Sequence, residues 1–493
     1  MLSKEDNELL ARVGPGTPTG ELFRQYWLPF LLPHELDPDG PPLRIRLLGE
    51  DLIAFQDSDG RVGLLADHCS HRGASLFFGR NEECGLRCVY HGWKYDVNGN
   101  CVDMPNEPEP HTGDQAGADP QDEATLMGAA PRRFKDKIRH RAYPCVEYGG
   151  LIWTYMGPRT EPPALPLLEW TQVPEPHRYA AKRLQHCNWA QALEGEIDQS
   201  HVSFTHSRVA AHRSMSAEQE AEADIRNPIG RYSRIDKHPV FSAIDTDGGV
   251  LINARRNADD RDMYYHRLTN FLLPNHTMPP SGVQDDNPTR VYRGWVPIDD
   301  DNVLVVAVDF NPGRPLSEQE LARRKAGGGA GYVGDANFAP PTSAPFGAWE
   351  PKGNWSNDFF LDRELQRTRV FSGIPEFWAQ DAALQMSMGL ICNRSTEHLG
   401  TSDLGIITVR RRLLDAVKQL RDKGTIPPGV EDPTVYQVRS TLSFLPKGVD
   451  WFEAMADLRR VIPGTNPGGT ALGVPQAVSG AGRASRGGGD YPG

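Results

Sequence analysis

Two short metal-ligand pairs constrain this chain more than any other feature of its sequence. Residues 69–71 read C-S-H and residues 88–91 read C-V-Y-H, with sixteen residues between His71 and Cys88. Each pair places one thiolate and one imidazole on a short loop. Two thiolates on one iron and two imidazoles on the other form one type of [2Fe–2S] centre. The pattern therefore indicates a cluster whose candidate ligands are Cys69, His71, Cys88 and His91.

A structural zinc site is the alternative interpretation of the same four residues. Zinc sites typically place about two to four residues between paired cysteines and about three to five between paired histidines. Here each pair mixes the two ligand types, and C-x-H is tighter than the usual zinc spacing. Gly73 and Gly92 follow the two loops, which lets backbone N–H groups approach the sulfurs of a cluster. Ligand preference favours the iron–sulfur cluster.

A longer run around these pairs resembles a known family. Residues 68–108, HCSHRGASLFFGRNEECGLRCVYHGWKYDVNGNCVDMPNEP, are similar to the Rieske domain of the Rieske non-haem iron aromatic-ring oxygenases. The resemblance is nearest to the branch with phthalate dioxygenase and phenoxybenzoate dioxygenase, and it extends with gaps from Met1 to about residue 430. It implies an α+β chain: an all-β Rieske [2Fe–2S] domain, then a helix-grip catalytic domain in which an antiparallel sheet wraps around a helix.

The sequence divides into segments that fit this architecture. A length of 493 residues allows two or three domains. Apolar runs separated by Gly and Asp turns predict hairpins over about residues 43–157, whereas later segments mix helical and strand patterns. The predicted division is an N-terminal helical segment (1–42), the Rieske domain (43–160) with a mobile insertion (106–131), a catalytic iron domain (161–460) and a disordered Gly-rich tail (461–493).

Charge and cysteine usage exclude several classes of protein. The net charge of −12 makes nucleic acid a poor partner. Seven cysteines are too few and too scattered for a disulfide framework, which favours a reducing compartment. No apolar run approaches the roughly 20 residues that span a bilayer, and the start MLSKEDNELL has no signal-peptide core. We expect a cytoplasmic protein without a membrane partner.

A second candidate metal site lies in residues 188–206, NWAQALEGEIDQSHVSFTH. Asp198, His201 and His206 are spaced D-x2-H-x4-H, and two imidazoles with one carboxylate leave positions open on Fe(II). The segment has a helical pattern, and five residues turn roughly 140° on a helix. Both histidines can therefore reach one metal only if the helix ends, kinks or widens between them. Two histidines in a helix are ordinary core or surface residues more often than metal ligands, so their spacing alone does not favour a metal site. The resemblance implies that His201 and His206 bind iron and that Asp198 meets cluster ligand His91 across a subunit interface.

The third iron ligand is predicted on a helix over residues 374–390. Asp381 falls in an apparent apolar stripe, where a carboxylate is costly unless it is paired or metal-bound. The resemblance also places the family's ligand aspartate at this position. The other stripe members are Phe377, Leu384 and Met388, and the competing acids are Asp358 and Asp362.

The resemblance implies an oxygenase component that hydroxylates an aromatic substrate with O₂, and we expect that substrate to be carboxylated. Arginine grips carboxylates in two places, so Arg208, Arg256 and Arg267 are substrate candidates. Electrons would come from a separate NAD(P)H-dependent reductase, with or without a ferredoxin, because no G-x-G-x-x-G motif for flavin or nicotinamide occurs at a strand–helix junction. A homotrimer or trimer-based oligomer is implied. The alternatives are a monooxygenase or O-demethylase of an aromatic ether, an electron carrier without catalytic iron, and a zinc-stabilised binding protein.

Overall fold

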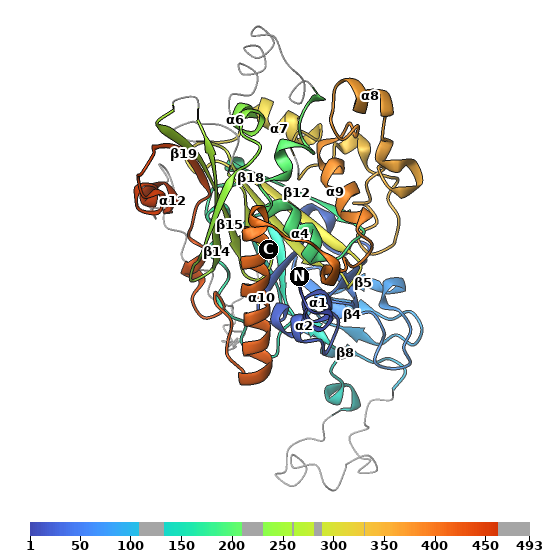
Figure 1. The fold of residues 1–493 in the computed structure, drawn as a ribbon. Helices are drawn as coiled ribbons and strands as arrows, with labels where there is room; N and C mark the ends of the chain where they lie inside the picture. Colours follow the sequence, from blue (N-terminus) through green and yellow to red (C-terminus); the bar gives the residue numbers. More distant parts are fainter. Residues whose placement is uncertain (108–132, 210–229, 259–260, 281–287, 330, 462–493) are drawn as a thin grey trace, which may run out of the picture.

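The computed structural model describes residues 1–107, 133–209, 230–258, 261–280, 288–329 and 331–461 (Figure 1). The predicted insertion and the predicted tail lie outside the described residues, except for residues 106–107 and 461. The division of the chain at residues 43, 161 and 461 stays a prediction.

The N-terminal segment contains two helices and one strand. Helix α1 is Lys4–Ala11 and helix α2 is Pro18–Phe23; the hydroxyls of Ser3 and Thr17 cap them. Residues 27–31, which we predicted within a helical segment, instead form strand β1, Trp27–Leu31. All five of its residues are buried, and it pairs antiparallel with β11 in a sheet of order β1-β11-β10. The run WLPFL explains the difference, since Pro29 interrupts a helix and bulky apolar residues suit a buried strand.

The predicted all-β domain is present. One antiparallel sheet has the order β2-β3-β4-β9 and a second has the order β5-β6-β7-β8. Between them lies a small core that includes Phe55, Leu86 and Trp93 and also holds Cys69 and Cys88. The strands are β2 Leu43–Leu47, β3 Glu50–Gln56, β4 Val62–Ala66, β5 Arg80–Glu82, β6 Gly85–Arg87, β7 Lys94–Tyr95, β8 Cys101–Asp103, β9 Ala142–Tyr143, β10 Cys145–Tyr148 and β11 Leu151–Tyr155.

The second half of the chain is built on an eight-stranded antiparallel sheet of order β12-β18-β17-β16-β15-β14-β13, with β19 also paired to β15. Helix α10, Leu404–Lys423, packs against β13 and β14 and runs along the sheet in Figure 1. This confirms the predicted α+β architecture. The strands are β12 Arg178–Gln185, β13 Val240–Asp245, β14 Gly249–Asn257, β15 Met263–Leu272, β16 His276–Met278, β17 Arg290–Pro297, β18 Val303–Phe310 and β19 Thr441–Pro446.

Two further helices position the second candidate site. Helix α4, Trp189–Ile197, packs against β17 on one side and against α9, Phe377–Ser387, on another. The end of α4 therefore lies beside the helix that carries Asp381. The remaining α-helices are α6 Gly230–Ile235, α7 Glu318–Lys325, α8 Arg363–Thr368, α11 Trp451–Ala454 and α12 Ala456–Arg459. Within the described ranges, no helix has the length and apolar character needed to cross a membrane.

Candidate active site

The end of α4 separates the two histidines of the D-x2-H-x4-H motif. The helix stops at Ile197, and Asp198 is its C-cap residue with a backbone φ of −74° and ψ of 113°. Asp198 Oδ1 then accepts a hydrogen bond from Ser200 N at 2.7 Å, and a short 3-10 turn, η7, begins at His201. The helical prediction for residues 188–206 is therefore wrong beyond Ile197. This break is the condition under which both histidines can face one point.

His201, His206 and Asp381 form a compact cluster of ligand atoms. The two histidine Nε2 atoms are 3.1 Å apart, and Asp381 Oδ1 lies 3.4 Å from His201 Nε2 and 3.1 Å from His206 Nε2. Ligand atoms at about 2.1 Å from one metal, and at right angles to one another, are about 3 Å apart. The three separations thus fit one face of a six-coordinate metal, as in a two-histidine, one-carboxylate iron site.

A glutamine that sequence reasoning missed sets the orientation of His206. Gln380 Oε1 lies 2.9 Å from His206 Nδ1, and Gln380 Nε2 donates to the carbonyl of Ile374 at 2.9 Å. With Nδ1 donating to Gln380, the lone pair of Nε2 faces the ligand atoms of His201 and Asp381. The imidazole of His206 also stacks on Phe377 at a centroid distance of 4.2 Å. The only feature of the sequence that could have pointed to Gln380 is its position directly before Asp381.

The local charges favour a cation at this point. Asp198 Oδ2 lies 3.5 Å from His201 Nδ1. Burial lowers the pKa of His201, but the hydrogen bond to Asp198 and the charge of Asp381 raise it by more, to about 9. For Asp381, burial raises the pKa, but the interactions with the imidazoles of His206 and His201 outweigh burial and lower it. Two carboxylates therefore flank two imidazoles, which is a donor set suited to a divalent metal.

The structure corrects the argument that selected Asp381. Phe377, Leu384 and Met388 do not form a buried stripe, because they are 40%, 46% and 54% exposed. The buried face of α9 instead contains Trp378, Ala379, Gln380, Ala382, Ala383, Gln385 and Met386. Asp381 lies at the border of that face. The competing acid Asp362 caps helix α8 by accepting from two backbone N–H groups, and Asp358 is absent from the His201 cluster.

Two of the three candidate arginines meet at Gln199, which precedes His201 by two residues. Arg256 donates to the carbonyl of Gln199 at 2.7 Å, and Arg267 Nε donates to Gln199 Oε1 at 2.9 Å. Arg256 is 1% exposed, and its NH1 group is buried with no hydrogen-bond partner among the residues that the structure describes. Burial lowers the pKa of Arg256 to about 10. Arg208, in contrast, has an exposed side chain on the segment that bridges to Val370.

The loop that carries Cys69 and His71 and the loop that carries Cys88 and His91 close in the same way. The N–H of Cys69 donates to the carbonyl of Ala74 at 2.9 Å, and the N–H of Cys88 donates to that of Trp93 at 2.8 Å. Each glycine then donates back to its cysteine carbonyl at 2.9 Å, with φ of 74° at Gly73 and 82° at Gly92. Such positive φ values suit glycine. The glycine N–H groups thus tighten the loops through backbone carbonyls.

The four candidate cluster ligands converge at the tips of these loops. The imidazoles of His71 and His91 have centroids 4.4 Å apart, and the thiols of Cys69 and Cys88 are buried side by side. His71 Nδ1 is buried and has no hydrogen-bond partner within the described ranges, which is costly for a polar nitrogen that binds nothing. Tyr95 Oη lies 3.2 Å from Cys69 Sγ, where it can donate to a thiolate. These features fit a histidine-ligated [2Fe–2S] cluster.

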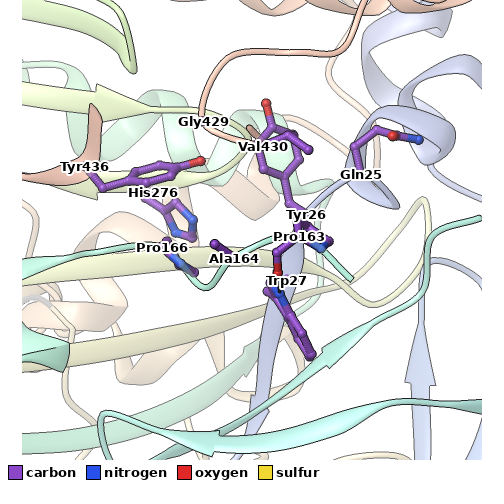
Figure 2. A pocket seen from close by; sticks show the side chains of 10 residues that line it. All are labelled: Gln25, Tyr26, Trp27, Pro163, Ala164, Pro166, His276, Gly429, Val430 and Tyr436. Atoms are coloured by element: carbon purple, nitrogen blue, oxygen red, sulfur yellow. Dashed lines mark hydrogen bonds between the residues drawn. The ribbon is translucent and has the colours of Figure 1, made fainter. Parts of the chain in front are cut away.

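A small pocket elsewhere belongs to the contact between the two halves of the chain (Figure 2). Its polar groups are already used: Tyr26 donates to Pro428 O, Trp27 donates to Pro163 O, and Tyr436 donates to Leu273 O. Burial lowers the pKa of His276 in its wall to about 3, so this imidazole is neutral. The pocket therefore joins the N-terminal strand to the C-terminal segment, and it offers no metal-ligand set.

Known proteins match both halves of the chain. Residues 26–116 match the Rieske [2Fe-2S] domain and residues 154–462 match the LigXa C-terminal domain like family. The 3-chlorobenzoate-3,4-dioxygenase oxygenase subunit of Comamonas testosteroni is 37% identical over 92% of this chain and 97% of its own length. The phthalate 4,5-dioxygenase oxygenase subunit of Pseudomonas putida is 35% identical over 92% of this chain and 95% of its own. Among solved structures, a Pseudomonas putida CBB5 NdmA mutant with caffeine has a TM-score of 0.51 at 15% identity, over 88% of this chain and 99% of that one, a likeness of fold alone.

Proposed function

Because this chain belongs to the Rieske oxygenases, as the oxygenase subunit of a multicomponent aromatic dioxygenase or monooxygenase with a Rieske [2Fe–2S] cluster, we propose that it oxidises a carboxylated aromatic compound at a mononuclear iron. The proposed ligands of that iron are His201, His206 and Asp381. The observation that carries the proposal is the convergence of one ligand atom from each within 4.8 Å.

We propose Cys69, His71, Cys88 and His91 as the cluster ligands, supported by the paired loops and by the unpartnered Nδ1 of His71. When bound, the cluster supplies electrons one at a time, and Fe(II) supplies O₂ activation. The protein fixes the geometry. Gln380 holds His206 in one tautomer, the carboxylate of Asp198 lies 3.5 Å from Nδ1 of His201, and Phe377 covers one face of the His206 ring.

The substrate carboxylate is proposed to bind Arg256, with Arg267 beside it. Chlorobenzoate and phthalate, in the names of the two relatives, both carry a carboxylate. Arg256 NH1 is a buried donor with no partner in the described part of the chain, and the NH2 group of the same guanidinium contacts Gln199, two residues before His201. A buried guanidinium that lacks one acceptor gains strongly from a carboxylate. Arg208 is the weaker candidate because its side chain is exposed.

The test is turnover with chemically supplied electrons. Enzyme loaded with Fe(II) should incorporate oxygen from labelled O₂ into aromatic carboxylates and contain about three iron and two sulfide per chain. Arg256→Gln should raise KM for the carboxylate more than for the matching uncharged amide, whereas Arg208→Gln should leave that ratio unchanged. Stoichiometric zinc without sulfide, or equal effects of both variants on both substrates, would contradict the proposal.

The remaining parts of the proposal concern partners and assembly. A separate NAD(P)H-dependent reductase, with or without a ferredoxin, supplies the electrons, and the location is the cytoplasm. The working unit is a cyclic trimer in which Asp198 of one chain meets His91 of the next. Exposed apolar side chains next to both groups support such a contact: Val89 and Tyr90 are 56% and 58% exposed beside His91, and Phe204 is 43% exposed after His201.

A further inference from the structure

A concentrated basic segment borders the cluster domain of this acidic protein. The described residues 133–141 read RFKDKIRHR, with five basic side chains and one acidic side chain, Asp136, in a chain whose net charge is −12. Their centre forms a short 3-10 helix, η4, Phe134–Lys137, which packs against β8. Charge of one sign on a small surface creates a local potential that the whole-chain charge does not reveal.

Three of these basic side chains carry positive charge that no described acid neutralises. Lys135, Lys137 and Arg139 form no ion pair with any residue in the described ranges. Lys137 and Arg139 are exposed, and Lys135 Nζ donates to the carbonyl of Val102 at 2.9 Å. Arg141 does not contribute, because it pairs with Glu50 at 2.9 Å. We call Lys135, Lys137 and Arg139, with Phe134, the basic docking surface.

An aromatic path leads from this surface to the cluster. Phe134 is 50% exposed, and its ring meets the edge of Trp93 at a centroid distance of 6.0 Å. Trp93 is 3% exposed and stacks on His71 at 4.5 Å with an interplanar angle of 11°. Its Nε1 donates to Asn106 Oδ1 at 2.8 Å, which fixes the indole plane. The basic docking surface thus ends one side-chain layer from a proposed cluster ligand.

The surface is also hollowed, as a docking site for a convex partner would be. An open hollow beside η4 is lined by Asn100, Cys101, Val102, Lys135, Asp136 and Arg139. Asp103, the nearest acid on β8, is held by Arg87 at 2.7 Å and so adds little negative charge. The charge balance across the hollow therefore remains positive.

We propose that the basic docking surface binds an acidic iron–sulfur electron-donor protein, which passes each electron to the cluster along the Phe134, Trp93 and His71 edge. In each encounter one electron leaves the reduced donor and enters the oxidised cluster of this chain. The inference rests on the proposed function, because it requires that the cluster is filled from outside. Complementary charge steers such encounters and weakens with salt.

The experiment measures reduction of the oxidised cluster in holoenzyme by stopped flow. The probe is a chemically reduced plant-type [2Fe–2S] ferredoxin of net negative charge. The variant Lys137→Glu/Arg139→Glu is compared with Arg323→Glu/Lys325→Glu, an equal charge change at exposed residues of α7, at the opposite end of the molecule from β8 (Figure 1). A neutral photoreduced deazaflavin serves as a reductant that needs no docking.

At low ionic strength the second-order rate with ferredoxin should fall about tenfold or more in Lys137→Glu/Arg139→Glu, and its dependence on salt should flatten. The α7 variant should match the wild type, and deazaflavin should reduce all three proteins equally. Phe134→Ala should lower the limiting rate at saturating ferredoxin. Equal ferredoxin rates in both double variants would overturn the docking surface. If the wild type does not turn over substrate with deazaflavin as the reductant, the proposed function itself is contradicted.

Discussion

Replacing Gln380 with leucine is expected to weaken iron binding at the His201, His206 and Asp381 site by about 10- to 100-fold without changing the cluster. Gln380 accepts from His206 Nδ1 and donates to Ile374 O, both at 2.9 Å. Leucine has similar size but offers neither bond. The imidazole of His206 is then free to turn or to change tautomer, and its Nε2 lone pair no longer points reliably at the metal.

Gln380→Leu is expected to have two effects, a loss of affinity for iron and a loss of folding stability. A 10- to 100-fold loss of affinity corresponds to about 1.4–2.7 kcal/mol. The same substitution leaves the Nδ1–H group of His206 and a carbonyl unpaired, which costs about 1–3 kcal/mol of folding stability for a buried group. The control is Gln385→Leu. Gln385 lies on the same helix with the same 5% exposure as Gln380, but its Oε1 accepts from Gln185, away from the histidines.

The assay is a chelator competition that follows mononuclear iron, with the visible spectrum of the cluster as internal reference. Both variants should lose similar thermal stability, and only Gln380→Leu should lose iron affinity and single-turnover yield. If Gln380→Leu binds iron as tightly as Gln385→Leu, the hydrogen bond to His206 does not orient an iron ligand, and the reasoning fails.

Three further predictions follow from particular contacts. Asp381→Ala should lower iron from about three to about two per chain while both sulfides remain, whereas Asp362→Ala should keep all three; the reverse result would make Asp362 the ligand. Mixing Asp198→Ala chains with Cys69→Ser chains should restore part of the activity if electrons cross between subunits, and a fully active monomer would contradict the ring. Burial lowers the pKa of His276 from 6.5 to about 3. Its contribution to stability is therefore present above pH 6.5 and is lost as the pH falls toward 3, by about 2 kcal/mol at pH 5. His276→Asn should reduce the difference in Tm between pH 7.5 and pH 5, and an unchanged difference would refute this.

Local patterns explain which features the sequence predicted. The loops at Cys69 and Cys88 are set by neighbouring residues and by two glycines with positive φ, so their spacing alone identified them. The strand patterns in the later segments reflect runs of apolar and β-branched residues, such as those in β14 and β18. β1 was missed because its partner, β11, lies more than a hundred residues away, and the pairing is what makes it a strand.

The proposed iron site shows where such reasoning stops. Asp381 was selected because of a predicted buried stripe that is in fact exposed. It lies beside His201 and His206 because α9 packs beside the end of α4. Periodicity gives the faces of a helix, but it does not say which face meets the core. Gln199 and Gln380 were missed for the same reason. Both act through contacts with residues far away in the chain, and a lone glutamine in a helix or turn carries no sign of them.

The two proposed contacts of the cluster domain require different edges of the cluster. In the proposed ring, His91 faces the neighbouring chain, beside the exposed Tyr90 and Val89. A subunit interface is permanent on the time scale of turnover, so an electron donor that must bind and leave cannot share it. His71 lies on the other side of the histidine pair, stacked on Trp93 and thus next to Phe134. Entry past His71 and exit past His91 would let reduction of one cluster proceed while the ring stays closed, and the basic charges lie on the entry side.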